Sequence, residues 1–291
     1  MSFEILEGLA PVAGYYKAFI VDLWGVVHNG RKPYPGALDC LHKFRKKGGK
    51  VILVSNAPRT HDYVVEYLEN MGVKRGDYDY ILTSGDITRS VLENQDHDLI
   101  RNRGRKFYQI GATRDKGLDD GLDYSRVMEV AAADFLICTG LVDDTTETPE
   151  DYRRLLSEAL SKDLPMLCAN PDLTVMRGEE MIYCAGSIAA LYEEMGGRVA
   201  LFGKPLAETY RRAMAILGLN DASDILAIGD SIRTDIKGAN EAGIDSVLVG
   251  GGIHAEEWGL ENGQAPSSAQ IEKIVKQYGF APTFVVGRMN W

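Results

Sequence analysis

The sequence lacks an excess of positive charge and has no long hydrophobic run. Its 291 residues carry 32 Lys and Arg against 42 Asp and Glu, which gives a formal net charge of −10. Nucleic-acid binding needs a basic surface to neutralise phosphates, so this balance argues against a nucleic-acid partner. No run of 18 apolar residues occurs. We therefore expect no membrane-spanning segment and no membrane partner.

Cysteine is scarce and does not form a metal or redox motif. The four cysteines are Cys40, Cys138, Cys168 and Cys184. They show no CxxC spacing, which zinc and redox sites usually have. Residues 1–17 lack the basic and apolar regions of a secretory signal. Because disulfides are rare in the cytoplasm, we predict a cytoplasmic protein with reduced, mostly buried thiols.

The sequence is rich in apolar runs that alternate with amphipathic segments. Hydrophobic residues make up 45% and charged residues 25% of the chain, as in ordinary globular proteins. The strand-like runs are 19–21, 51–54, 81–82, 224–228 and 245–249, and the helix-like segments are 37–47, 59–71, 207–217 and 236–242. This alternation predicts an α/β fold with a doubly wound, Rossmann-like parallel sheet covered by helices on both faces.

A second, smaller α/β set occupies the middle of the sequence. It has strand-like runs at 106–110, 135–137 and 166–168 and a helix-like segment at 149–160. The charged segment 93–106 indicates the exit from the core, and Cys184-Ala185-Gly186-Ser187 indicates the return. We therefore predict a core from residues 1–102 and 185–291, with a domain of residues 103–184 inserted between them. The last residues, 261–291, look less regular and receive no function.

The most informative stretch is Val21-Asp22-Leu23-Trp24-Gly25, where an apolar strand ends in a carboxylate. Open α/β sheets bind their ligands at the carboxyl ends of the strands. Asp22 is therefore a candidate nucleophile or metal ligand. A carboxylate two residues later would ordinarily share the proton transfers, and that position holds Trp24.

Polar residues also end three other predicted core segments. Ser55-Asn56 follows one strand, Gly203-Lys204-Pro205 precedes a helix, and a strand-to-helix loop carries Asp230 and Asp235. A parallel sheet brings its strand ends to one edge, so we expect these groups to meet. Oxygen ligands of this kind suit Mg²⁺. Phosphoryl transfer needs in-line positioning and nearby cations, so the sequence predicts Mg²⁺-dependent phosphoryl chemistry.

In order and spacing these motifs resemble the haloacid dehalogenase superfamily, in particular its subfamily IIA-like phosphatases with a large α/β cap of the C2 type. The resemblance covers nearly the whole chain. It rests on Asp22 to Val26 with Pro35-Gly36-Ala37, on Ser55-Asn56, on Gly203-Lys204-Pro205, on Gly229 to Asp235, and on the cap and cap-to-core segments Asn170-Pro171-Asp172 and Gly186 to Ala190. It implies a cap inserted between the second and third motifs.

The resemblance also implies a role for each matched residue. Asp22 would attack phosphorus and form an aspartyl-phosphate, Ser55 would hold a phosphoryl oxygen, and Lys204 would neutralise both. Mg²⁺ would be held by the carboxylates of Asp22 and Asp230 with the backbone carbonyl of Trp24, and Asp235 would support that site. The further candidates for substrate contact are Asn56, Asn170, Asp172 and Trp24.

Position 24 departs from the family pattern, because these phosphatases usually carry an aspartate there as general acid and base. An indole N–H cannot exchange protons near neutral pH, although the backbone carbonyl of Trp24 is retained. Losing a general acid costs roughly 10²–10⁴-fold in rate, so we expect a slow enzyme limited to activated leaving groups. His28 is the only nearby alternative proton donor. Trp24 either packs beneath the cap or stacks on the substrate.

Two other functions fit the same residues. Besides a phosphatase, the chain could be a non-catalytic phosphate- or metabolite-binding protein. The other alternative is a carbon–halogen hydrolase, since dehalogenases of the superfamily also have an aromatic residue two positions after the nucleophile. Asp230 and Asp235 favour a metal and therefore phosphate chemistry. The partner we predict is a small phosphorylated substrate. The sequence leaves open whether the chain forms a homo-oligomer.

Overall fold

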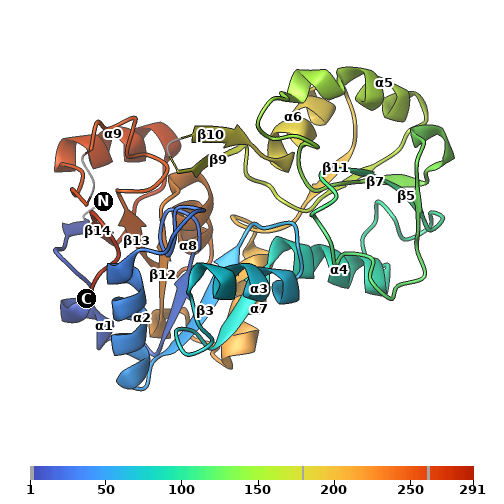
Figure 1. The fold of residues 1–291 in the computed structure, drawn as a ribbon. Coiled ribbons are helices and arrows are strands. Elements are labelled where there is room, and N and C mark those ends of the chain that lie inside the picture. Colours follow the sequence, from blue (N-terminus) through green and yellow to red (C-terminus); the bar gives the residue numbers. More distant parts are fainter. Residues whose placement is uncertain (1–2, 179, 261–262) are drawn as a thin grey trace.

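The chain forms two main sheets of parallel strands, one in each lobe of the computed structural model (Figure 1). The structure describes residues 3–178, 180–260 and 263–291. The larger sheet has the order β1-β14-β13-β12-β2-β3-β4, and every neighbouring pair is parallel. Its strands are Glu4–Ile5 (β1), Ala18–Val21 (β2), Lys50–Ser55 (β3), Tyr80–Thr83 (β4), Ile225–Gly229 (β12), Asp245–Val249 (β13) and Phe284–Val286 (β14). The predicted doubly wound α/β core is confirmed.

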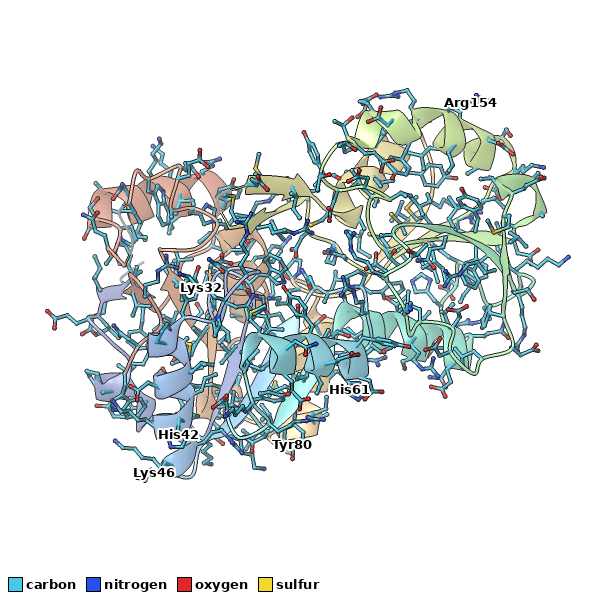
Figure 2. All side chains as sticks on the ribbon, in the orientation of Figure 1. Lys32, His42, Lys46, His61, Tyr80 and Arg154 are labelled. Carbon is cyan, nitrogen blue, oxygen red and sulfur yellow. The ribbon has the colours of Figure 1, made fainter. Side chains whose placement is uncertain are left out.

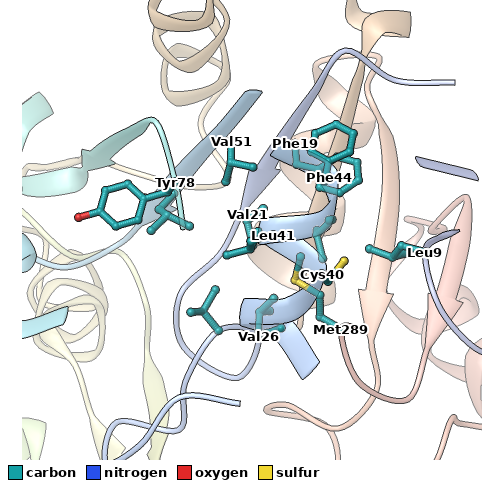
Figure 3. Close-up of a cluster of buried hydrophobic side chains, with 14 of the residues drawn as sticks. Leu9, Phe19, Val21, Val26, Cys40, Leu41, Phe44, Val51, Tyr78 and Met289 are labelled. Atoms are coloured by element: carbon teal, nitrogen blue, oxygen red, sulfur yellow. The ribbon is translucent and has the colours of Figure 1, made fainter. Parts of the chain in front are cut away.

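Helices cover both faces of this sheet, because successive strand residues point to opposite sides. Phe19 and Val21 belong to one hydrophobic cluster, whereas Ala18 and Ile20 belong to another. Figure 3 shows the first cluster, where Phe19 and Val21 face α2. The helices of this lobe are Ala10–Ala13 (α1), Pro35–Lys46 (α2), His61–Met71 (α3), Ser84–Asn94 (α4), Ala207–Leu217 (α7), Lys237–Glu241 (α8) and Ser268–Tyr278 (α9), with the short turns Ala222–Asp224 (η3) and Ile232–Ile236 (η4).

The strand order reverses between β2 and β12, at the centre of the larger sheet. From β2 the chain proceeds outward to β3 and β4, and from β12 it proceeds in the opposite direction to β13 and β14. Connections that diverge in this way leave a crevice at the carboxyl ends of the two strands. Asp22 directly follows β2 and Asp230 directly follows β12. The topology therefore places both carboxylates at the binding crevice.

The smaller sheet belongs to the second lobe and is also parallel throughout, in the order β11-β8-β7-β5-β6. Its strands are Lys106–Ile110 (β5), Ser125–Val127 (β6), Phe135–Cys138 (β7), Met166–Cys168 (β8) and Val199–Leu201 (β11). The helical segments of this lobe are Val130–Ala132 (η1), Pro149–Tyr152 (η2), Arg153–Ser161 (α5) and Ala185–Glu194 (α6). The predicted second α/β set is therefore present.

The predicted return to the core at residue 184 is too early. Helix α6 buries Ile188 and Ala189 in the hydrophobic cluster of the smaller sheet, together with Leu136 of β7. Strand β11 pairs with β8, so the smaller sheet extends to Leu201. The segment Cys184-Ala185-Gly186-Ser187 begins α6, so it marks the start of a helix of the second lobe and not the return to the core.

A hairpin projects from the second lobe toward the first. It consists of Thr174–Arg177 (β9) and Glu180–Tyr183 (β10), which pair antiparallel, and Figure 1 shows it between the lobes. The backbone N–H of Gly178 donates to the carbonyl of Asn29, 3.0 Å away, in the loop after β2. Helix α4 adds a second connection, because Leu92 shares a hydrophobic cluster with Phe107 and Phe135 of the smaller sheet.

The C-terminal segment is more regular than the sequence suggested. Its described part contains α9, which begins with a capping box between Ser267 and Gln270, and β14, which pairs with both β13 and β1. Residues 261–262 lie outside the described residues. In the part of the chain that the structure describes, no helix combines the length and apolar character needed to cross a membrane.

Helix α2 offers a matched test of the core packing. Leu41 is fully buried against the larger sheet, whereas its neighbour His42 lies on the outer surface (Figures 2 and 3). Leu41→Ala should lower the free energy of unfolding by about 2–5 kcal/mol, because it removes buried methyl groups and leaves a cavity. His42→Ala should change it by less than about 0.5 kcal/mol. Urea denaturation would measure both, and equal effects would contradict this packing.

Candidate active site

Carboxylates and one lysine from distant parts of the chain meet at the crevice between β2 and β12. The ammonium of Lys204 lies 2.5 Å from Oδ1 of Asp22 and 2.7 Å from Oδ1 of Asp235. All three side chains are buried, and Lys204 is only 3% exposed. Asp22 and Lys204 are 182 residues apart in the sequence. The expected convergence of these strand ends is thus present in the structure.

The acidic groups at this point form a set that suits a hard cation. Asp22, Asp230 and Asp235 each offer a carboxylate oxygen, and these oxygens lie within 4.8 Å of one another. Burial raises the pKa of Asp22 to about 7, against the lowering effect of Lys204, and burial also raises the pKa of Asp230 well above its usual value. Three buried carboxylates beside one ammonium leave negative charge to be compensated. Oxygen ligands in this arrangement fit Mg²⁺.

Two glycines from different loops leave the space that Asp230 occupies. Gly25 has φ +77°, and a Cβ there would lie 1.9 Å from Oδ2 of Asp230. A Cβ on Gly252 would lie 2.1 Å from the same oxygen, which also accepts the backbone N–H of Ile253 at 2.7 Å. In the sequence, the glycines at 250–252 indicate a turn but not a contact with Asp230. Their contact with Asp230 depends on the loop after β13, which no motif marks.

Asn56 joins three segments of the site through its side-chain amide. Its Nδ2 donates to Oδ1 of Asp172 at 2.9 Å and to the carbonyl of Lys204 at 3.2 Å, and its Oδ1 accepts the backbone N–H of Lys204 at 2.8 Å. Both ends of the amide are therefore engaged by the protein. Asn56 was predicted to contact substrate, and these bonds give it a positioning role. The neighbouring Ser55 is buried, and its Oγ accepts the N–H of Ala57 at 3.2 Å.

The segment Asn170-Pro171-Asp172 brings a carboxyl group of the second lobe into the site. Oδ1 of Asn170 accepts the backbone N–H of Asp172 at 2.9 Å, which fixes the turn. A Cβ on Gly186 would lie 2.4 Å from the carbonyl oxygen of Pro171, so this close approach requires glycine. Burial raises the pKa of Asp172 to about 6. Asp172 and Asn170 both line the cavity that contains Asp22.

Trp24 and His28 pack against each other at the same cavity. The indole is half-buried, its ring centroid lies 5.2 Å from that of His28, and the two rings meet edge to face. His28 is fully buried, and its Nδ1 accepts the N–H of Gly30 at 3.0 Å. Burial lowers the pKa of His28 to about 4. His28 is therefore neutral at pH 7 and has no imidazolium proton to donate.

A cavity of about 830 Å³ lies between the lobes and includes all of these groups. Residues that the sequence did not single out complete its wall, and they come from both lobes: Arg59, Tyr67, Arg114, Asp115, Asp144 and Arg177. Arg59 of the first lobe donates to Asp115 of the second at 3.1 Å. Tyr67 lies on α3, Arg177 lies on the hairpin, and the other four lie in loops. None of these segments carries a motif, so sequence alone could not identify them.

Comparisons with known proteins agree with this geometry. A family model described as haloacid dehalogenase-like hydrolase matches residues 19–123, a second with that description matches 104–243, and one described as HAD-hydrolase-like matches 201–286. A curated acid sugar phosphatase of Staphylococcus aureus is 24% identical, over 89% of this chain and 95% of that protein.

Solved structures extend the likeness to the whole fold. A p-nitrophenyl phosphatase from Archaeoglobus fulgidus is 25% identical, with 94% of this chain and 96% of that chain covered and a TM-score of 0.69. A haloacid dehalogenase-like hydrolase from Brucella suis 1330 is 38% identical, with coverage of 98% and 100% and a TM-score of 0.82. Since family models cover both lobes and a 38% identical structure spans the chain, this protein belongs to the haloacid dehalogenase-like hydrolase family.

Proposed function

We propose that this protein is a Mg²⁺-dependent phosphatase that cleaves small phosphate monoesters through an aspartyl-phosphate on Asp22. The observation that carries the proposal is the buried contact of Asp22 with Lys204, beside two further carboxylates at the centre of the sheet. The names of its relatives support the same reaction class, since they include an acid sugar phosphatase and a p-nitrophenyl phosphatase.

In the first step a carboxylate oxygen of Asp22 attacks phosphorus, and the bond from phosphorus to the ester oxygen breaks. The leaving oxygen keeps the electron pair and needs a proton unless it is already a weak base. The pKa of Lys204 is raised: burial lowers it, but the carboxylates of Asp22 and Asp235 outweigh that effect. Lys204 therefore stays charged, favours the ionised form of Asp22 against the effect of burial, and would stand beside the negative phosphoryl oxygens. The Ser55 hydroxyl, whose oxygen accepts the N–H of Ala57, would donate its own hydrogen to them.

In the second step a water oxygen attacks the phosphorus of the aspartyl-phosphate, and the bond from phosphorus to Asp22 breaks. Inorganic phosphate leaves and the carboxylate is restored. Asp22, Asp230 and the backbone carbonyl of Trp24 would hold Mg²⁺, with Asp235 in support. When bound, Mg²⁺ supplies positive charge to the phosphoryl oxygens.

The first step depends on the leaving group, because neither Trp24 nor His28 can protonate it. The indole of Trp24 cannot donate a proton near pH 7, and His28 is neutral there. A nitrophenolate or an acyl-phosphate carboxylate leaves without a proton, whereas a sugar alkoxide does not. The missing acid is worth about 10²–10⁴-fold on poor leaving groups. We infer that this phosphatase turns over activated esters well and sugar phosphates poorly.

The proposal also covers the compartment of the protein and its binding partners. All four cysteines are free and buried, which suits a reducing compartment such as the cytoplasm. The partner is a small phosphorylated metabolite, not a nucleic acid or a membrane, and the proposal does not include an oligomeric state. The carboxylate cluster favours phosphate over carbon–halogen chemistry, because attack on a haloacid needs no metal.

A panel of phosphate esters with leaving groups of graded acidity tests the missing-acid account. We expect Mg²⁺-dependent hydrolysis of 4-nitrophenyl phosphate and poor hydrolysis of sugar phosphates. In Trp24→Asp, the ratio of kcat/KM for sugar phosphate to that for 4-nitrophenyl phosphate should rise at least about tenfold. Trp24→Phe is the matched control and should not raise this ratio. Equal wild-type activity on both classes would contradict the account, and Asp172→Asn would then test whether Asp172 supplies the proton.

Replacement of the nucleophile separates an enzyme from a binding protein. Asp22→Asn should lower kcat on 4-nitrophenyl phosphate by at least about 10³-fold, because an amide cannot accept the phosphoryl group. Mass spectrometry after an acid quench should find one phosphoryl group on Asp22 of the wild-type chain. Asp39→Asn, an exposed position on α2, is the control. Turnover without a phosphorylated Asp22 would overturn the nucleophile assignment, and binding without turnover would indicate a sensor.

The space around Asp230 predicts an effect on metal affinity. In Gly252→Ala the added Cβ would displace the Asp230 carboxylate, so the Kd for Mg²⁺ should rise about 10- to 100-fold, as when a group that supports a metal ligand is changed. Isothermal titration calorimetry with Mg²⁺ alone would measure this. Gly14→Ala adds a Cβ into open space and should leave the Kd unchanged. An unaltered Kd in Gly252→Ala would mean that Asp230 does not hold the metal.

A further inference from the structure

We propose that Arg114 and Arg177 form a second anion-binding subsite in the cavity, which selects phosphate esters whose leaving group carries another anionic group, a carboxylate or a second phosphate. This inference rests on the proposed function, because the ester's own phosphoryl group is taken to lie at Asp22. The subsite belongs to the second lobe and is separate from the Lys204 cluster.

Both arginines converge on one carboxylate, Asp144. Arg177, on β9, donates from Nη1 to Oδ1 of Asp144 at 2.9 Å and from Nη2 to Oδ2 at 2.6 Å. Arg114, in the loop after β5, donates from Nη2 to Oδ2 at 2.5 Å. The side chain of Asp144 is only 10% exposed, whereas those of Arg114 and Arg177 are 48% and 32% exposed. The two guanidinium groups are thus anchored by a buried acid and still open to the cavity.

The two guanidinium groups share one carboxylate as their ion-pair partner. The exposed Asp143 lies near Arg114 but forms no ion pair with it in the described residues, and the nearby pair of Arg59 and Asp115 is neutral. Arg114 forms one bond with Asp144, and within the described part of the chain its other N–H groups have no partner. A guanidinium with spare, roughly coplanar donors binds a carboxylate or phosphate through paired, charge-assisted hydrogen bonds. An anion bound here would accept hydrogen bonds from the N–H groups that Arg114 does not use for Asp144.

The phosphoryl group does not need these arginines. Lys204 already stands at Asp22, and in the described residues no hydrogen bond or ion pair joins Arg114 or Arg177 to Asp22 or Ser55. The cavity of about 830 Å³ is also far larger than a phosphoryl group and falls in the range of sites for whole small molecules. The arginines therefore face the part of the substrate that leaves.

Part of the remaining wall can contact an apolar body of that leaving group. Trp24, Tyr67, Leu141 and Val175 line the cavity together with the arginines. The Tyr67 hydroxyl donates to the carbonyl of Gly30 at 2.8 Å, which holds its ring in place. A leaving group with an apolar body and an anionic end would therefore meet both kinds of contact.

Matched pairs of esters test the subsite. The probes are 4-(carboxyalkyl)phenyl phosphates with one to three methylene groups and their primary amides, so that size and leaving-group acidity match within each pair. A third series carries a terminal phosphate in place of the carboxylate and distinguishes the two anions. For the wild-type protein with Mg²⁺, at least one anionic member should exceed its amide in kcat/KM by about 10- to 100-fold, mainly through a lower KM.

Variants locate the effect. Arg114→Ala should reduce the ratio of kcat/KM between the anionic ester and its amide at least about tenfold, and Arg114→Lys should restore only part of it, because lysine cannot form the paired bonds. Arg153→Ala is the control, since Arg153 is an exposed cap arginine that pairs with Glu150 and does not line the cavity. It should leave the ratio unchanged.

The outcomes separate this inference from the proposed function. If the wild-type protein hydrolyses these esters with no preference for an anionic member, or if Arg114→Ala keeps the preference, the subsite is overturned and the phosphatase proposal stands. If no ester is hydrolysed and Asp22 is never phosphorylated, the proposed function fails. Calorimetry of the same esters with Asp22→Asn then decides the subsite. Tighter binding of the anionic member that is lost with Arg114→Ala would support it, and equal binding would overturn it.

Discussion

The ion pairs of Lys204 with Asp22 and Asp235 are the interaction on which the rest of the structure depends. A buried ammonium is stable only beside opposite charge, so Lys204 ties the loop after β2 to the loop after β12. Removing one partner would leave an uncompensated buried charge, which costs several kcal/mol. The topology makes this contact possible, because strand order reverses between these two strands. The reversal of strand order therefore gives rise both to the crevice and to the ion pair that lies in it.

Several contacts join the two lobes, so that residues of both lobes line the same cavity. Asn56 of the core bonds to Asp172 of the second lobe, Arg59 pairs with Asp115, and the hairpin at Gly178 bonds to the loop after β2. Helix α4 shares its hydrophobic cluster with the smaller sheet. The inserted lobe is therefore held as a wall of the site. This wall carries Arg114 and Arg177, which we propose to bind an anionic group on the leaving group.

Position 24 separates two tasks that one residue usually combines in this family. A backbone carbonyl can serve a metal whatever the side chain is, whereas proton transfer needs a titratable group. In the proposed function, tryptophan therefore keeps the first and loses the second. It also adds an aromatic surface beside Asp22, packed edge to face against His28. Under this proposal Asp22 and Lys204 govern the reaction class and the cavity wall governs the substrate range, so the two can change independently.

The sequence by itself determined the sheet of the core, the family and the residues of the central cluster, because strand-end motifs such as Asp22 and Asp230 are local signals and a parallel sheet must gather them. It did not reveal the end of the inserted lobe, since α6 and β11 belong to that lobe only through their packing and pairing with the smaller sheet. Nor did it reveal Gly252 beside Asp230 or the pairing of Arg114 and Arg177 with Asp144. Those contacts join loops whose relative positions no local pattern encodes. Only the packing of the two lobes decided them, because a side chain's partner in a cavity depends on where distant backbone lies.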